Sequence, residues 1–241
     1  MADTDAAGGA TGTLALVGGG EWRDGCTFDA GLLEASGGGR VVVLPTAAAY
    51  EHPERLVLRA AEWFAPLGAE VEGVMVLTRA DAGDPGTAEV IRGARFLYLA
   101  GSSPMHLRSV LKGSPAWDAL VAAWHGGAVV AGSSAAAMVL TDPMVDARGG
   151  GLTVGLGLVT GVAVVPHFGD VHEDVHGEKL HRSVLLAPPG IPVAGIPERT
   201  ALIRTGDGTW SAAGAGEVRV FLDGAPAADG LGALPGRVNA G

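Results

Sequence analysis

Cysteine, basic clusters and long apolar runs are all scarce in this sequence. Cys26 is the single cysteine among 241 residues, which excludes an intramolecular disulfide and is typical of a reducing compartment. The formal net charge is −10 and lysine and arginine form no cluster, so a basic face for nucleic acid is not expected. No apolar run approaches the roughly 20 residues of a membrane span, and residues 1–12 lack the pattern of a signal peptide. We therefore expect a cytoplasmic protein that binds neither nucleic acid nor membrane.

Short apolar runs alternate with helical patterns along the first 140 residues. Buried strands are predicted at 13–17, 40–46, 70–77, 95–100 and 129–133, with helices at 53–67, 85–92, 104–112 and 115–124. This alternation predicts an α/β fold, with a mostly parallel central sheet and helices on both faces. Short strands after residue 192 are expected to be partly antiparallel. We expect one α/β domain over 1–241, with flexible ends at 1–12 and from about 225 to 241.

The run at 129–140 organises the chain. It reads as a buried strand, a sharp turn and a short helix, with a serine at the corner. Such a turn needs small residues two before and two after the nucleophile, and both Ser133 and Ser134 meet that condition. The flanking residues are Ala131, Gly132, Ala135 and Ala136. Spacing alone therefore does not choose between the two serines.

Two further segments are expected at the same edge of the sheet, because ligands lie outside the carboxyl ends of parallel strands. Gly18-Gly19-Gly20 follows the first strand, but Arg23 stands where a dinucleotide motif would have its last glycine. We interpret this turn as one that lets the backbone pass close to the site. His167 follows the strand at 162–165, so its imidazole can reach a serine at the elbow.

Four blocks of residues occur in an order that resembles peptidase family S51. They are Ala15–Glu21, Gly132–Ala137, Gly157-Leu158 with the later Pro166-His167-Phe168, and Gly195–Leu202. This family of serine peptidases includes aspartyl dipeptidase (dipeptidase E) and cyanophycinase, on a fold similar to class I glutamine amidotransferases. The resemblance spans roughly residues 13 to 204. It implies that fold here, and hydrolysis of a small, dipeptide-like peptide or a related amide, with no cofactor.

The resemblance also implies roles for individual residues. The family elbow reads Gly-x-Ser-Ala-Gly-Ala, which places the nucleophile on Ser134 and the general base on His167. The oxyanion donors would be the N–H of Ala135 and an N–H of Gly101 or Ser102, in the turn after the fourth strand. Two departures stand out. The family turn Gly-Gly-Asp/Asn-Gln is here Gly-Ser-Ser-Pro at 101–104, and alanine at 136 replaces the second elbow glycine.

A third catalytic residue is less clearly marked. Asp146 lies twelve residues after Ser134, in a loop that could return toward His167, and is the favoured candidate. Asp142 and Glu198 are the alternatives.

The segment after His167 bears on which substrate is preferred and on whether a metal takes part in the reaction. Residues 169–176 are acidic and rich in histidine rather than rich in arginine, so a preference for cyanophycin is not expected and a basic peptide or amine is the guess. His172–His176 also match H-E-x-x-H, in which Glu173 would be the base of a zinc hydrolase. Gly177 follows at once and leaves no long helix, so we predict no metal and keep this as an alternative.

The other alternative is a binding or regulatory protein that retains the fold without activity. The expected partner is a small peptide substrate, with a homodimer as an open alternative.

Overall fold

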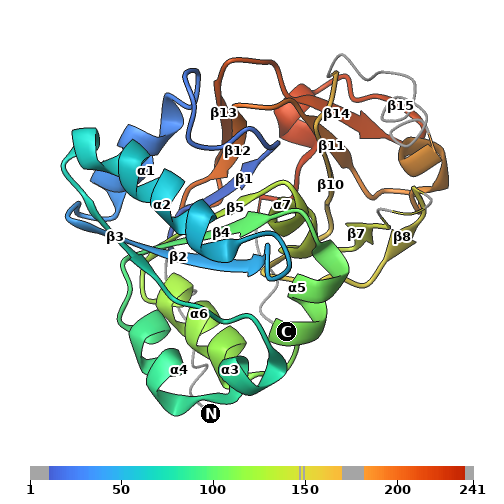
Figure 1. Ribbon diagram of the computed structural model, residues 1–241. Coiled ribbons are helices and arrows are strands. Elements are labelled where there is room, and N and C mark those ends of the chain that lie inside the picture. Colours follow the sequence, from blue (N-terminus) through green and yellow to red (C-terminus); the bar gives the residue numbers. More distant parts are fainter. Residues whose placement is uncertain (1–10, 147, 149, 170–181, 237–241) are drawn as a thin grey trace, which may run out of the picture.

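A seven-stranded sheet forms the centre of the computed structural model, which describes residues 11–146, 148, 150–169 and 182–236 (Figure 1). The strand order is β13-β12-β1-β5-β4-β2-β3. The five strands from β3 to β1 are parallel, and β12 and β13 are antiparallel. The strands are β1 (Leu14–Val17), β2 (Arg40–Ala47), β3 (Glu70–Gly73), β4 (Phe96–Gly101), β5 (Val129–Ser133), β12 (Thr200–Arg204) and β13 (Trp210–Gly214).

Both faces of this sheet are buried because alternate residues of each strand point to opposite sides. Leu14 and Leu16 pack on one side, and Ala15 and Val17 on the other. One face is covered by α1 (Phe28–Ala35) and α2 (Pro53–Phe64). The opposite face is covered by α3 (Arg79–Gly83), α4 (Pro85–Arg92), α5 (Pro104–Leu111), α6 (Pro115–His125) and α7 (Ala135–Val139). The helices α2, α4, α5 and α6 each begin with proline, whose fixed φ suits the first helical turn.

A second sheet lies beside the carboxyl ends of the central strands. Its order is β10-β11-β14-β15, and β10 and β11 are parallel. Its strands are β10 (Ala163–Pro166), β11 (Val193–Ile196), β14 (Arg219–Leu222) and β15 (Ala225–Pro226). The remaining short elements are β6 (Thr141–Asp142), β7 (Met144–Val145), β8 (Leu152–Thr153), β9 (Val159–Thr160), and the 3-10 helices η1 (Ala65–Leu67) and η2 (Gly230–Ala233). The pairs β6–β9 and β7–β8 are separate two-stranded ladders.

The predicted fold class is confirmed: the central sheet is mostly parallel, helices lie on both faces and antiparallel strands follow near the C-terminus. The third strand ends at Gly73 and not at the expected residue 77. After it, the Val76 N–H donates to Val74 O within the chain's own turn, and the N–H groups of Leu77 and Thr78 donate to the Asp81 carboxylate at the start of α3. Within the described part of the tail expected to be flexible, Trp210 Nε1 donates to Pro235 O at 2.9 Å and Leu234 is buried. No helix in the described part of the chain is long and apolar enough to cross a membrane.

Candidate active site

Ser134 occupies the sharp corner between β5 and α7. Its φ of 54° and ψ of −111° are strained for a residue with a side chain, which is a feature of nucleophile elbows. The Ser134 N–H donates to Val17 O at 2.9 Å and so ties the corner to β1. A methyl group at Gly132 would lie 2.6 Å from Leu140 Cδ1 and 3.3 Å from Ala136 Cβ. The bare Gly132 therefore leaves room for the Ala136 methyl group in the tight turn.

The structure distinguishes the two serines that spacing left equivalent. Ser133 is fully buried, and its Oγ donates to Glu21 Oε2 at 2.7 Å. Ser134 Oγ instead lies 2.8 Å from His167 Nε2, and Ser134 borders both pockets at this edge. Ser134 is thus the serine whose hydroxyl faces a base.

His167 is held between Ser134 and Glu198. The His167 Nδ1 lies 2.9 Å from Glu198 Oε1, so one ring nitrogen faces a hydroxyl and the other a carboxylate. The parallel pairing of β10 with β11 places Pro166 opposite Ile196. The chain then runs one residue further to His167 and two further to Glu198, which brings the two side chains together.

The aromatic residue after His167 locks this arrangement. A methyl group at Gly195 would lie 2.9 Å from Phe168 Cγ, so the Phe168 ring rests directly on the β11 backbone. The Phe168 N–H donates to Ile196 O at 3.1 Å. The two blocks around His167 and around Gly195 are therefore packed against each other.

The glycine turn after β1 supports the base from the other side. Gly19 has a φ of 109°, and a methyl group on it would lie 2.3 Å from His167 Cε1. The His167 N–H donates to Gly18 O at 2.8 Å, and the Arg199 N–H donates to Gly19 O at 2.7 Å. The turn thus passes against the imidazole, where only glycine fits.

The structure places Glu198, and not the favoured Asp146, beside His167. The Asp146 carboxylate accepts hydrogen bonds from Arg148 Nε at 3.1 Å and from Arg148 Nη2 at 2.9 Å. These bonds hold the pKa of the Asp146 carboxyl below its ordinary value. Asp142 accepts the Gly155 N–H at 3.0 Å instead of facing the histidine. Both aspartates are used within their own loop, whereas Glu198 follows a strand paired with that of the histidine.

The residues expected as oxyanion donors lie around Ser134. Ala135 is the first residue of α7, where helical N–H groups have no partner within the helix. Gly101 ends β4 with a φ of 124°, and the Ser103 N–H donates to Ala47 O at 2.9 Å, which ties the next turn to β2. The Ser102 hydroxyl donates to Glu51 Oε1. Gly101, Ser102 and Ala135 each border at least one of the pockets that contain Ser134.

Two pockets of different character meet at Ser134 and His167. The first, which we call the apolar pocket, has a volume of about 240 Å³. Its walls are formed by Pro104, Met138, Val145, Val165 and Pro166, with Ser102, Ala135 and Asp146 beside them. The second, the charged pocket, has a volume of about 270 Å³. Its charged lining residues are Glu21, Arg23, Glu51, Arg59 and Glu198.

Sequence reasoning did not identify a role for Glu21 or Glu51. Glu21 accepts the Ser133 hydroxyl and lies 3.5 Å from Arg59 Nη2, so it joins the elbow to α2. Glu51 holds the turn after β4 through Ser102. The position of Glu21 directly after the glycine turn was a usable signal, since that turn was expected at the site. No local pattern marks Glu51.

Among the residues that the structure describes, no group of three or more histidine, cysteine, aspartate or glutamate side chains is placed to hold a metal ion. The His172–His176 motif lies outside the described residues, so its alternative stays a prediction.

The fold is of the class I glutamine amidotransferase-like type, and a serine, where those proteins have cysteine, stands at the sharp turn after β5. The model of peptidase family S51 matches residues 14–211, and the chain belongs to that family of peptidases.

One solved structure supports this assignment, and a second shows the same fold. A peptidase from an acI-B1 Actinobacterium is 29% identical with a TM-score of 0.78, over 90% of this chain and 93% of the other. A peptidase E candidate from Listeria monocytogenes EGD-e is 16% identical with a TM-score of 0.60, over 88% of this chain and 99% of the other, and shows the same fold. No curated protein matches the sequence.

Proposed function

We propose that this chain is a serine peptidase that hydrolyses short peptides through Ser134, His167 and Glu198. The observation that carries the proposal is the continuous contact from Ser134 Oγ to His167 Nε2 at 2.8 Å and from His167 Nδ1 to Glu198 Oε1 at 2.9 Å. A hydroxyl is a weak nucleophile until a base removes its proton, and the base needs a partner that fixes its tautomer. Membership of a peptidase family supports a peptide as the substrate.

The reaction proceeds in two halves. His167 Nε2 takes the proton of Ser134 as Oγ bonds to the peptide carbonyl carbon, and Glu198 stabilises the imidazolium. The N–H of Ala135 and an N–H of Gly101 or Ser102 stabilise the oxyanion. The C–N bond then breaks, and the imidazolium gives its proton to the leaving amine. Water, deprotonated by His167, releases the acyl group and restores Ser134.

The size of the site favours small substrates. Each pocket beside Ser134 has a volume of about 240 to 270 Å³, which suits one residue on each side of a scissile bond. We place the reaction in the cytoplasm, since the single cysteine is a buried free thiol and needs no oxidising compartment.

A fluorophosphonate probe tests the proposal. We expect covalent labelling of the wild-type protein, its loss in Ser134→Ala and its retention in Ser133→Ala, which removes the neighbouring hydroxyl. Mass spectrometry of the labelled peptide identifies the modified serine. A folded protein that is not labelled, or labelling that persists in Ser134→Ala, would contradict the serine mechanism and favour a binding protein. Loss of activity on chelation would favour the metal-dependent alternative.

A further inference from the structure

We propose that the apolar pocket is a side-chain subsite, and that this peptidase prefers substrates with an uncharged apolar residue on one side of the scissile bond. The inference rests on the proposed function, because it assigns a substrate class to the same site. It differs from the guess of a basic substrate that the acidic segment after His167 suggested.

The first support is the composition of the walls. Met138 comes from α7, one turn after Ser134, while Val145 comes from β7 and Val165 from β10. All three side chains are largely buried and border the cavity. Pro104 and Pro166 add two rings that carry no donor. A volume of about 240 Å³ accommodates a branched or aromatic side chain in van der Waals contact with these groups.

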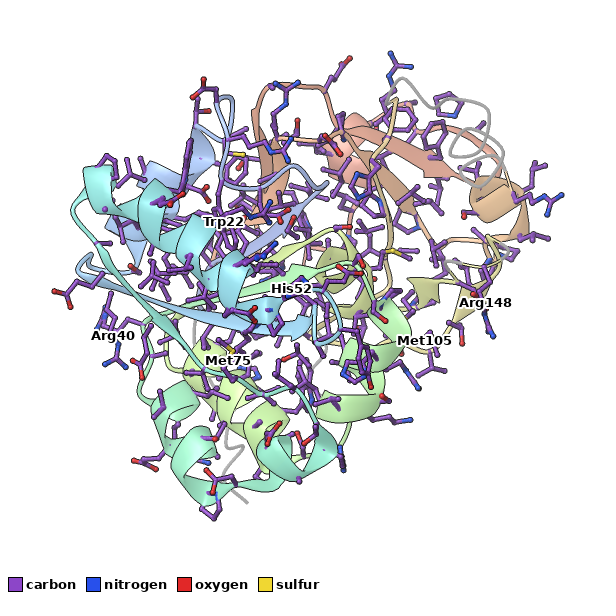
Figure 2. The ribbon with its side chains drawn as sticks, in the orientation of Figure 1. Trp22, Arg40, His52, Met75, Met105 and Arg148 are labelled. Atoms are coloured by element: carbon purple, nitrogen blue, oxygen red, sulfur yellow. The ribbon has the colours of Figure 1, made fainter. Side chains whose placement is uncertain are left out.

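The second support is the charge at the pocket. None of the described residues that line it is lysine or arginine, and its one carboxylate, Asp146, is already bound by Arg148. Arg148 projects outward near β7 and β8 (Figure 2), and its side chain is 79% exposed. An acidic side chain would bring a second carboxylate between apolar walls, where it loses hydration without gaining a cation. A basic one would find its counter-charge already occupied.

The third support is the contrast with the charged pocket. Arg23 and Arg59 line that pocket together with Glu21 and Glu51. Charged groups of the substrate, including a free terminus, are therefore better solvated in the charged pocket. This contrast between the two pockets assigns the apolar part of the substrate to the apolar pocket.

A series of substrates tests the preference on both sides of the scissile bond, and a series of covalent inhibitors tests the residue N-terminal to it. The first consists of dipeptides X–Ala and Ala–X, with X as leucine, phenylalanine, alanine, aspartate or lysine. The second consists of serine-directed amino-phosphonate diphenyl esters with the same side chains. We expect leucine or phenylalanine to exceed aspartate and lysine by at least about tenfold in kcat/KM or inactivation rate at one position. The absence of this preference for leucine or phenylalanine at both positions would overturn the inference.

Filling the pocket tests its location. Met138→Phe and Val145→Phe enlarge walls that belong to different elements, so failure of one variant to fold leaves the other. We expect each to lower the ratio of leucine to alanine substrate turnover by about tenfold, while Met105→Phe, the same substitution on the exposed surface of α5, keeps the ratio. An unchanged ratio in a folded, fluorophosphonate-labelled pocket variant would place the subsite elsewhere. Failure of the proposed function is distinct, because it removes labelling of the wild-type protein altogether.

Discussion

At the scale of single residues, position within a hydrogen-bonded chain decides what a carboxylate can do. The sequence offers Asp146, Asp142 and Glu198 as candidates for the third catalytic residue. Of these three, only Glu198 reaches His167 Nδ1. Asp146 and Asp142 are held by Arg148 and by the Gly155 N–H. In the proposed mechanism, the charge of Glu198 stabilises the imidazolium formed during attack.

Glu198→Gln tests that charge while retaining an oxygen that can accept the Nδ1–H bond. We expect kcat to fall by about 10- to 1,000-fold with a much smaller change in KM, because the lost interaction strengthens in the transition state. Steady-state kinetics on the best dipeptide provide the measurement. Asp142→Asn is the matched control, since its amide oxygen can still accept the Gly155 N–H, and it should stay within about twofold of wild type. Equal losses in both variants would argue against a role for Glu198.

Gly19→Ala tests the close approach of the glycine turn to the base. The added methyl group would lie 2.3 Å from His167 Cε1, at a φ of 109° that alanine disfavours, so the ring must shift away from Ser134. We expect at least a roughly 100-fold slower reaction with the fluorophosphonate probe.

Gly31→Ala, on the exposed side of α1, provides the control. Nothing lies within 4 Å of the added methyl group, and alanine favours the helix, so its labelling rate should equal that of wild type. A Gly19→Ala protein that reacts as fast as this control would show that the turn does not constrain the base.

At the scale of elements, the site is assembled where strand ends meet. β5 supplies the elbow, β10 and β11 supply the base and its partner, and β1 supplies the glycine turn. The turn from β4 to α5 is linked to the loop from β2 to α2, through the Ser102 hydroxyl and Glu51.

A double-mutant cycle on Glu51 and Ser102 tests the link between the two loops. We expect Glu51→Ala and Ser102→Ala each to lower kcat by about tenfold, and the double variant to be no slower than either one, because both remove the same contact. Glu51→Gln retains an acceptor and should recover most of the rate. Losses that multiply in the double variant would show that the two residues act independently.

At the scale of the whole molecule, one buried carboxyl opposes stability. Asp29 of α1 is fully buried, Trp63 Nε1 donates to its Oδ2 at 2.9 Å, and its Oδ1 has no hydrogen-bond partner among the described residues. Burial raises the pKa of Asp29 to about 7, and nearby Glu21 also raises it, while the Trp63 hydrogen bond lowers it. Trp22, which is labelled in Figure 2, packs against Tyr98 with ring centroids 5.1 Å apart.

The sign of the resulting pH dependence follows from linkage. Below about pH 4 the Asp29 carboxyl is protonated in both the folded and unfolded states and contributes nothing. Between about pH 4 and 7 the unfolded chain ionises while the folded one keeps its proton, so the free energy of unfolding falls as pH rises. The loss reaches at most about 1.4 kcal/mol per pH unit and is complete above pH 7.

Asp29→Asn should remove this dependence because an amide does not titrate in this range. The amide oxygen can still accept the Trp63 N–H, so the hydrogen bond is kept. We expect the variant to gain stability relative to wild type from pH 5 to pH 8, by up to about 3 kcal/mol, in urea unfolding. A stability difference that does not change with pH would show that Asp29 does not titrate in this window.

Spacing left Ser133 and Ser134 equivalent, and the family resemblance favoured Ser134. The sequence by itself determined the alternation of strands and helices, the elbow at 132–136 and the place of His167 after a strand. These depend on local signals, namely apolar periodicity, proline at helix starts and small residues in a tight turn. Only the tertiary structure decided that Glu198 faces the histidine, since nothing local distinguishes it from Asp146 and the choice depends on the register of β10 with β11. The same holds for the burial of Asp29 and for the two contrasting pockets, because each is formed by side chains from several elements that meet only when the chain has folded.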